Sequence, residues 1–258
     1  MTEQVPSSRT TYARVEGIAS LKPRPDGIGA VVPFDFALDD ELWAYLPAGV
    51  RLHVTRTPAR EGLIDADLVA EVSGQAVVRE AAAAIAAARP AVTVYGCTTG
   101  SYMGGLEGER AIRQTISRAT GSDAVTTSGA LLEAASAVGV SRLAVATPHD
   151  RTLAAGLADF LEEAGMEVPS VAYLALDRDI QEASGSTIRV LARRADTSEA
   201  QALFLSCTNL PTLELIPELE DELGKPVLAA NQVTLWAALR RLGRTNPAVQ
   251  QALFQVSC

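Results

Sequence analysis

The chain has 258 residues, enough for one large domain or two small ones, and 48% of them are hydrophobic. Its net charge is −9, and no Lys/Arg cluster is dense enough to contact a phosphate backbone, so we expect no nucleic-acid partner. Three cysteines without a CxxC pair and two distant histidines argue against a disulfide framework and against a zinc site. No apolar run reaches the roughly 18 residues of a membrane span, and the N-terminus lacks the pattern of a secretory signal. We therefore expect a reduced, cytoplasmic protein with no membrane association.

The first part of the chain alternates between short apolar runs and helical periodicity. Residues 1–26 are polar and end in a proline-rich stretch, which predicts a loosely held N-terminal arm. The apolar or alternating runs predict strands at 27–35, 51–58, 91–97 and 123–128, and the helical spacing predicts helices at 64–88, 106–121 and 129–139.

The remainder of the chain continues the same alternation. It predicts strands at 141–150, 168–176, 202–207 and 225–232, and helices at 151–165, around 197–202, at 212–224 and at 233–243. Strands that alternate with helices of this length are typical of an α/β protein with parallel sheets.

An internal repeat divides the chain. Three pairs of segments match in the same order, namely 28–35 with 143–150, 94–98 with 204–208, and 124–139 with 226–243. A repeat of this length corresponds to whole subdomains rather than to solenoid units. We expect a first α/β subdomain of residues 27–125 plus 226–258, and a second one of residues 126–225.

Two cysteines occupy equivalent places in this repeat. Cys97 and Cys207 each end an apolar run and are each followed by threonine. Ligands of parallel sheets bind beyond the carboxyl ends of the strands, so two facing halves would bring both thiols to one cleft. There, opposed thiols can move a proton across a carbon, or one can add to an activated double bond while the other handles a proton.

The surroundings of the two cysteines differ. Cys207 precedes a predicted helix start, whose dipole would favour the thiolate, and Cys97 precedes a turn rich in Gly, Thr and Ser that offers donors to a carboxylate. The alternative is that each cysteine is simply a small core residue, as isolated buried cysteines usually are. Their equivalent positions favour the functional interpretation.

The stretches "GCTTGS" and "SCTNLPTLELIPELEDELGKPVLAANQVTLWAALRRLG" resemble the aspartate/glutamate racemase superfamily, and within it the maleate cis-trans isomerase and arylmalonate decarboxylase branch. The resemblance runs from about Ile28 to Gly243 and implies two pseudo-symmetric Rossmann-like subdomains with the active site between them, no cofactor or metal, and a homodimer. It also implies Cys97 as nucleophile and Cys207 as acid/base, with a group of carboxylate-binding residues: Thr98, Thr99, Thr208 and Asn209.

Three further residues are candidates for substrate contact because they depart from that family's pattern. Phe36 stands where the isomerases typically have an asparagine, Asp35 lies beside it, and His149 replaces a common tyrosine. Asp35 would repel a second carboxylate unless it is protonated or paired. A monocarboxylate, or an acid with an amide or hydrophobic end, would therefore suit the site better than maleate.

The resemblance and the two cysteines together favour a cofactor-independent isomerase of a small carboxylic acid, similar to maleate isomerase. Family members that decarboxylate malonates have glycine at the first cysteine position, so the presence of both cysteines disfavours that activity here. The alternatives are an arylmalonate-type decarboxylase, an amino-acid or hydantoin-type racemase, and a non-catalytic protein that binds a small acid.

Overall fold

The computed structural model of the chain describes residues 26–256, so the expected arm at 1–26 lies outside the described residues except for Asp26. Two four-stranded sheets form the centre of the fold, in the orders β2-β1-β3-β4 and β6-β5-β7-β8, and every pairing is parallel. The strands are β1 (Gly27–Val32), β2 (Arg51–Arg56), β3 (Val92–Tyr95), β4 (Asp123–Thr126), β5 (Leu143–Thr147), β6 (Val171–Tyr173), β7 (Ala202–Leu205) and β8 (Val227–Ala229).

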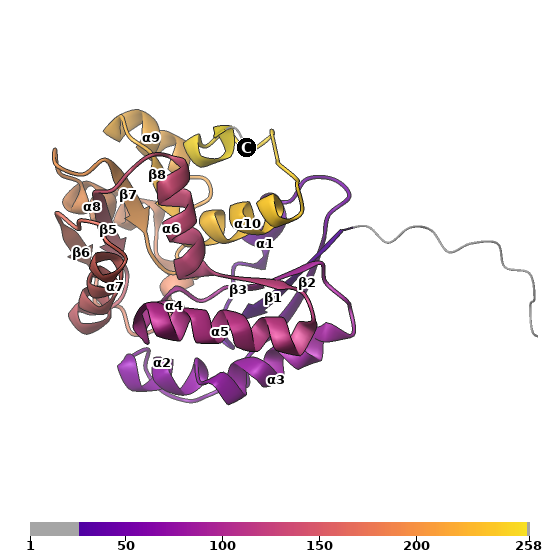
Figure 1. Cartoon of the computed structure of the whole chain (residues 1–258). Coiled ribbons are helices and arrows are strands. Elements are labelled where there is room, and N and C mark those ends of the chain that lie inside the picture. The colour runs from indigo at the N-terminus through magenta and orange to yellow at the C-terminus, as the bar shows by residue number, and fades with distance from the viewer. Residues whose placement is uncertain (1–25, 257–258) are drawn as a thin grey trace, which may run out of the picture.

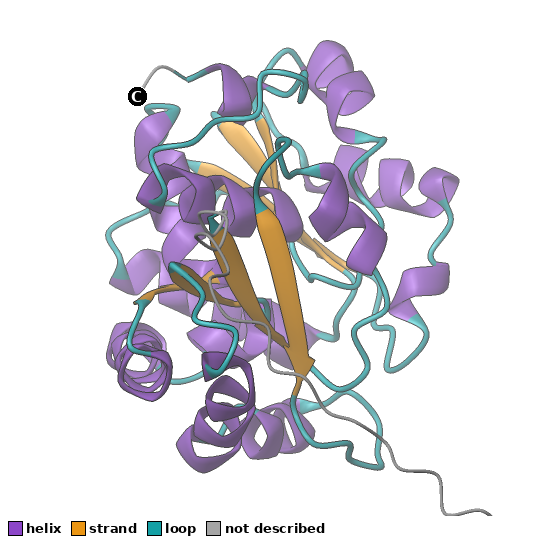
Figure 2. Ribbon diagram, turned by 90° about the vertical axis from the view of Figure 1, so that its right-hand side faces the viewer, coloured by secondary structure: helices purple, strands orange, loops and turns teal. Residues whose placement is uncertain are grey.

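The two sheets have the same strand order once four is added to each strand number. The repeated sequence segments correspond to β1 and β5, to β3 and β7, and to β4 and β8 with the helices that follow them. The central strands are apolar and buried over their whole length because helices cover both faces of each sheet, as expected for parallel sheets. The predicted α/β fold of two similar halves is thereby confirmed (Figures 1 and 2).

Helices connect successive strands and cover both sheets. They are α1 (Asp39–Ala44), α2 (Ala66–Val72), α3 (Gln75–Ala86), α4 (Thr98–Tyr102), α5 (Gly105–Thr120), α6 (Thr127–Ala137), α7 (Arg151–Glu163), α8 (Gly185–Ala195), α9 (Ile216–Leu223) and α10 (Ala230–Arg241), with short 3₁₀ turns η1 (Ile180–Glu182) and η2 (Ala252–Gln255). Within residues 26–256, none of these helices has the length and apolar character needed to cross a bilayer.

Several expected helices differ from the observed ones. The helix expected over 64–88 is two helices, α2 and α3, because the chain breaks at Ser73 and Gly74. The helix expected around 197–202 is wrong. The helix before β7 is α8, which Ser184 caps by accepting a hydrogen bond from the Thr187 N–H.

The ends of two strands were also expected too late. β8 ends at Ala229 rather than at residue 232, and β4 ends at Thr126 rather than at residue 128. In both places the helix starts without an intervening loop, so residues that look like the end of an apolar strand form the first turn of α10 or α6. Asn231 therefore lies on a helix, close to the carboxyl end of its sheet.

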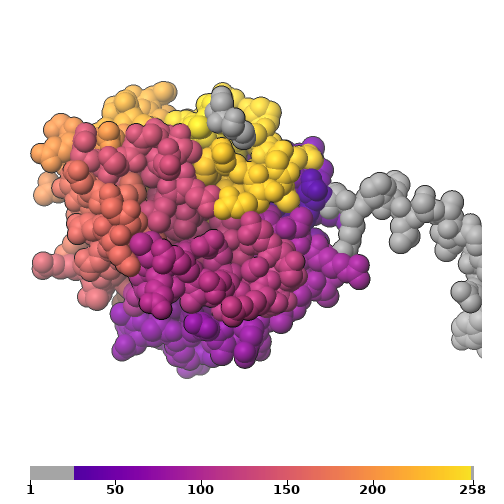
Figure 3. Space-filling model, viewed as in Figure 1, coloured from indigo at the N-terminus to yellow at the C-terminus, as the bar shows by residue number. Residues whose placement is uncertain are grey.

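One hydrophobic core joins the two halves. It contains Ile28 and Val92 of the first sheet together with Leu143 and Phe204 of the second. α10 crosses back to pack against α6, β3 and β4, although β8, just before it, pairs with β7 in the second sheet. The C-terminal segment accordingly lies against both halves in the space-filling view (Figure 3). The division into subdomains at 125/126 and 225/226 stays a prediction. We expected residues 226–258 in the first subdomain, and of these the strand β8 pairs with β7 in the second sheet.

Candidate active site

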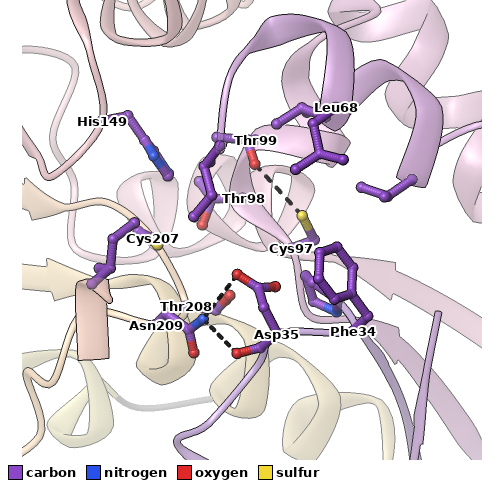
Figure 4. A pocket seen from close by; sticks show the side chains of 15 residues that line it. Phe34, Asp35, Leu68, Cys97, Thr98, Thr99, His149, Cys207, Thr208 and Asn209 are labelled. Atoms are coloured by element: carbon purple, nitrogen blue, oxygen red, sulfur yellow. Dashed lines mark hydrogen bonds between the residues drawn. The ribbon is translucent and has the colours of Figure 1, made fainter. Parts of the chain in front are cut away.

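A pocket lies at the carboxyl ends of the central strands, where the two halves meet (Figure 4). Its free space, open mouth included, is about 520 Å³. The segments after β1, β3, β5 and β7 all contribute to its wall, so the two halves of the repeat contribute equivalent segments to one site. The lining residues are Pro33, Phe34, Asp35, Ile64, Leu68, Val69, Val72, Cys97, Thr98, Thr99, His149, Ile180, Cys207, Thr208 and Asn209.

Cys97 is the N-cap of α4, and this short helix determines the position of its sulfur. The Gly100 N–H donates to Sγ at 3.3 Å, the Thr99 hydroxyl lies 3.6 Å from it, and the Tyr95 hydroxyl donates to the same sulfur. Gly100 is required there, because a Cβ at that position would come within 2.5 Å of the Tyr95 hydroxyl oxygen and 3.1 Å of Sγ. Cys97 is thus a buried sulfur with three hydrogen-bonding neighbours.

Burial and these donors act in opposite directions on Cys97. Burial raises the pKa of the Cys97 thiol above its usual value, and the nearby Asp35 raises the pKa further, while the contacts from Thr99, Gly100 and Tyr95 lower it. Burial is the larger effect. The resting thiol is therefore mostly protonated at neutral pH, but its surroundings are prepared to stabilise a thiolate once one forms.

Cys207 is held in a different way. Its backbone has a φ of 89°, in the left-handed region that residues other than glycine rarely adopt. The Leu210 N–H donates to the Cys207 carbonyl at 3.1 Å, and the backbone N–H groups of Asn209 and Leu210 lower the pKa of the thiol. Burial raises the pKa of the thiol to about 12, and Asp35 and Cys97 add to this shift. The expected helix dipole at Cys207 is absent, because α9 begins only at Ile216 and a turn comes between them.

Cys97 and Cys207 lie on opposite sides of the pocket, with the Asp35 carboxyl group between them in the view of Figure 4. Cys97 raises the pKa of the Cys207 thiol, and Asp35 raises the pKa of both thiols, so the three groups are electrostatic neighbours. The sequence-based expectation that both cysteines line one pocket matches this arrangement.

Two pocket residues carry buried polar atoms that have no hydrogen-bond partner in the described part of the chain. They are the Thr98 hydroxyl oxygen and the Nδ1 atom of His149, and both side chains are buried. Burial lowers the pKa of His149 to about 4, so the imidazole is neutral at neutral pH and has one N–H to donate. Unpartnered buried polar atoms in a pocket wall indicate a polar ligand group at that place.

Thr208 and Asn209 join the two halves beneath the pocket. The Thr208 hydroxyl donates to the Gly96 carbonyl at 3.3 Å, and the Asn209 amide donates to the Asp35 carbonyl at 3.1 Å. In return, the Asn209 side-chain oxygen accepts from the Ala37 N–H at 2.9 Å. These two expected carboxylate-binding residues line the pocket, but the polar atoms named here are already engaged in holding the loop after β1.

Phe36 does not lie where we expected it. Its side chain is packed in the shared hydrophobic core and does not line the pocket. The chain turns after β1, where the Phe36 N–H donates to the Pro33 carbonyl at 3.2 Å. Phe34 and Asp35 at this turn line the pocket, whereas Phe36 packs in the core. The Phe36 carbonyl accepts hydrogen bonds from the Arg56 guanidinium, which fixes this loop from the other side.

Sequence reasoning missed two groups of residues at this site. One is Tyr95, which precedes Cys97 by two residues on β3 and so points to the same side of the strand. The other is an apolar wall of Ile64, Leu68, Val69, Val72 and Ile180. The alternation along β3 was a signal for Tyr95. Ile64, Leu68, Val69 and Val72 looked in the sequence like the buried face of the helix expected over 64–88, and Ile180 lies outside any element that we expected.

A metal site is not assigned. Among residues 26–256, no group of three or more His, Cys, Asp or Glu side chains is arranged to hold a metal ion.

Comparison with known proteins places the chain beside two kinds of enzyme. The family model described as arylmalonate decarboxylase matches residues 60–254. A maleate isomerase of Nocardia farcinica is 31% identical over 166 residues, which cover 61% of this chain and 66% of that enzyme, just under two thirds of its length.

Solved structures match a larger part of the chain. The Nocardia farcinica maleate cis-trans isomerase, in a cysteine-to-serine variant with a covalently bound succinylcysteine intermediate, matches with a TM-score of 0.81 and 27% identity over 90% of this chain and 99% of that one. A double variant of arylmalonate decarboxylase in its liganded form matches with a TM-score of 0.81 and 26% identity, over 90% of this chain and 100% of that one.

Proposed function

The chain belongs to the arylmalonate decarboxylase family, and on that premise we propose that it is a cofactor-independent isomerase of a small unsaturated carboxylic acid, similar to a maleate isomerase. The observation that carries the proposal is the pair of thiols, Cys97 and Cys207, on opposite sides of one pocket. The maleate isomerase structure with a succinylcysteine intermediate is the relative whose chemistry such a pair would reproduce.

The environments of the two thiols support different roles. Cys97 has three hydrogen-bonding neighbours and is the better placed to carry negative charge, so we assign it as the nucleophile. Cys207, with a pKa of about 12, remains protonated and can donate a proton to a neighbouring carbon.

In the proposed reaction, the Cys97 thiol first loses its proton to solvent, and the resulting thiolate forms a carbon–sulfur bond with one alkene carbon. The electron pair of the double bond moves to the other alkene carbon, which takes the proton of Cys207. The remaining carbon–carbon single bond then rotates. The Cys207 thiolate removes a proton from the same carbon, the double bond forms again in the trans arrangement, and the carbon–sulfur bond breaks to release the Cys97 thiolate.

The test is conversion of cis-enoic acids to their trans isomers, followed through the vinyl signals by proton NMR without added cofactor. We expect Cys97→Ser and Cys207→Ser each to lower kcat/KM by roughly 10²–10⁴-fold, the usual contribution of a positioned acid or base. Cys258→Ser, which changes the third cysteine of the chain, is the matched control and should keep its activity. Full activity in either pocket variant would contradict the two-thiol mechanism.

The family model also favours a second candidate, a decarboxylase of a substituted malonate that protonates the product through Cys207. It predicts carbon dioxide release that persists in Cys97→Ala and is lost in Cys207→Ser. The Cys97 variant therefore separates the two candidates, because an isomerase loses its activity without Cys97 and a decarboxylase keeps it.

A further inference from the structure

Asp35 is the one pocket residue whose charge the proposed chemistry does not use. In the repeat it corresponds to Asp150, whose carboxylate caps α7 by accepting from the Leu153 N–H at 2.9 Å. In the first half, helix α1 begins only at Asp39, so Asp35 has no helix to cap. Its carboxyl group is instead exposed to the pocket and lies between the two thiols (Figure 4).

Among residues 26–256, no cationic side chain lines the pocket to neutralise Asp35. The groups that face its carboxyl are the thiols of Cys97 and Cys207 and the amide of Asn209, whose contact to Oδ2 is long, at 3.5 Å. Arg56, at the carboxyl end of the neighbouring strand β2, is engaged with the Phe36 carbonyl and with Asp39. A carboxylate of a ligand at this place would meet another carboxyl group with no compensating charge.

The other walls of the pocket provide for one acid group only. The unpartnered atoms of Thr98 and His149 supply donors on one side. Much of the remaining wall is apolar, formed by Phe34, Ile64, Leu68, Val69, Val72 and Ile180. An apolar wall offers no hydrogen bonds to a second carboxylate, which would lose its hydration without replacement.

Resting on the proposed isomerase function, we infer that the substrate is a cis-enoic acid with one carboxylate and a neutral, amide-type group at its other end, which donates a hydrogen bond to Asp35. Thr98 and His149 bind the carboxylate in this arrangement. The amide nitrogen faces Asp35, and the alkene lies between the two sulfurs. Asp35 thereby selects a monoamide over the corresponding dicarboxylate.

The experiment compares three cis probes with the full-length protein: maleamate, maleate and monomethyl maleate. Maleamate has the neutral donor, the ester is neutral without a donor, and maleate has the second charge. We expect kcat/KM for maleamate to exceed that for maleate by about 10²-fold, since the second carboxylate of maleate would meet the like charge of Asp35. The ester should fall between them.

Asp35→Asn removes the charge and keeps the shape. The ratio of kcat/KM for maleamate over maleate should fall at least tenfold in this variant, mainly because maleate turnover rises. Asp40→Asn removes the same charge from an exposed position on α1 and should leave the ratio unchanged. Thermal unfolding of both variants checks that each is folded.

The outcomes separate this inference from the proposed function. Equal or faster turnover of maleate by the unmodified protein overturns the inference and leaves the isomerase in place, and an unchanged ratio in Asp35→Asn does the same. Absence of turnover of all three probes overturns the isomerase. In that case, calorimetry with the saturated analogues still tests selectivity, because tighter binding of succinamate than of succinate supports the role of Asp35 and the reverse order refutes it.

Discussion

His149 is a buried, neutral imidazole in a position where the repeat has Phe34. Its Nδ1 atom has no partner within the protein, so the native state gains no hydrogen bond there to offset the removal of the ring from water. A ligand carboxylate is the group that would satisfy this atom. The buried imidazole therefore destabilises the free protein, and a hydrogen bond from Nδ1 to a bound ligand would offset this loss of stability.

This destabilisation predicts a pH dependence of stability. The pKa of His149 is about 4 in the folded protein against 6.5 in the unfolded chain, so the unfolded chain binds a proton first as the pH falls. The contribution is zero above pH 6.5 and destabilises the fold increasingly toward pH 4, by about 2 kcal/mol at pH 5. We expect His149→Gln to lose less unfolding free energy than the unmodified protein between pH 7 and pH 5 in urea titrations.

Other groups act in the opposite sense and are common to both proteins in that comparison. Burial raises the pKa of Asp35, Glu41 and Glu220 in the folded state, so protonation of these carboxyl groups favours folding as the pH falls. The difference between variant and unmodified protein isolates His149. An identical loss in the two proteins would contradict the lowered pKa.

At the residue scale, the candidate site could be predicted wherever a residue follows a central strand. Cys97, Cys207, Thr98 and His149 follow directly from strand ends and the internal repeat. Phe36 could not be placed, because whether a loop residue points into the pocket or into the core depends on where α1 starts.

At the scale of single elements, Glu41 of α1 holds the loop that carries Cys207. Its buried carboxylate accepts hydrogen bonds from the N–H groups of Thr212 and Leu213, at 2.7 and 2.9 Å, and from the Asn231 amide at 2.8 Å. The same Asn231 amide donates to the Thr208 carbonyl at 2.9 Å. One carboxylate of the first half thus anchors the β7–α9 loop and α10.

We expect Glu41→Gln to lower the free energy of unfolding by about 1–3 kcal/mol. Glutamine has one acceptor oxygen, and its NH₂ group would face one of the three donors, leaving that buried donor unsatisfied. Hydrogen exchange at the Thr212 and Leu213 amides should become faster, and urea titration measures the stability.

Glu80→Gln makes the same change on the exposed face of α3 and is the matched control. Unchanged protection of the Thr212 and Leu213 amides in Glu41→Gln would show that Glu41 does not anchor the loop.

Long elements of this fold were predictable from periodicity, and short ones were not. α5 and α7 have clear apolar stripes, and the expected spans agree with them closely. α1 and α4 have six and five residues, too few to show a helical period. The most important of the short helices is α4, since it provides the Gly100 N–H to Cys97. Its sequence "TTGSY" suggests a polar turn, yet the helix is buried, and the Ser101 hydroxyl makes its hydrogen bonds inside the core.

At the scale of the whole molecule, the two halves look separable in sequence but are not separable in their packing. The largest core contains side chains from both sheets, and α10 returns from the second half to cover the first. The Tyr102 hydroxyl of α4 donates to the Leu153 carbonyl of α7 at 2.8 Å, which adds a further contact between the halves. The repeat in the sequence predicted two subdomains, whereas the shared hydrophobic core joins the two halves into one packed unit.

A shared core predicts a single cooperative unfolding transition. The tryptophans are at positions 43 and 236, on α1 and on α10, so fluorescence reports on the region of the first sheet. Circular dichroism reports on helices of both halves. We expect the two probes to give the same urea midpoint.

Phe204 of β7 provides the sharper test, because it lies on the second sheet but in the shared core. Phe204→Ala should cost about 3–5 kcal/mol through the cavity it leaves, and Phe204→Leu, the milder change, should cost less. Both should lower the fluorescence midpoint as much as the dichroism midpoint. If the halves were independent, tryptophan fluorescence would keep its midpoint while the dichroism separated into two transitions, and the pocket could then open by loss of one half alone.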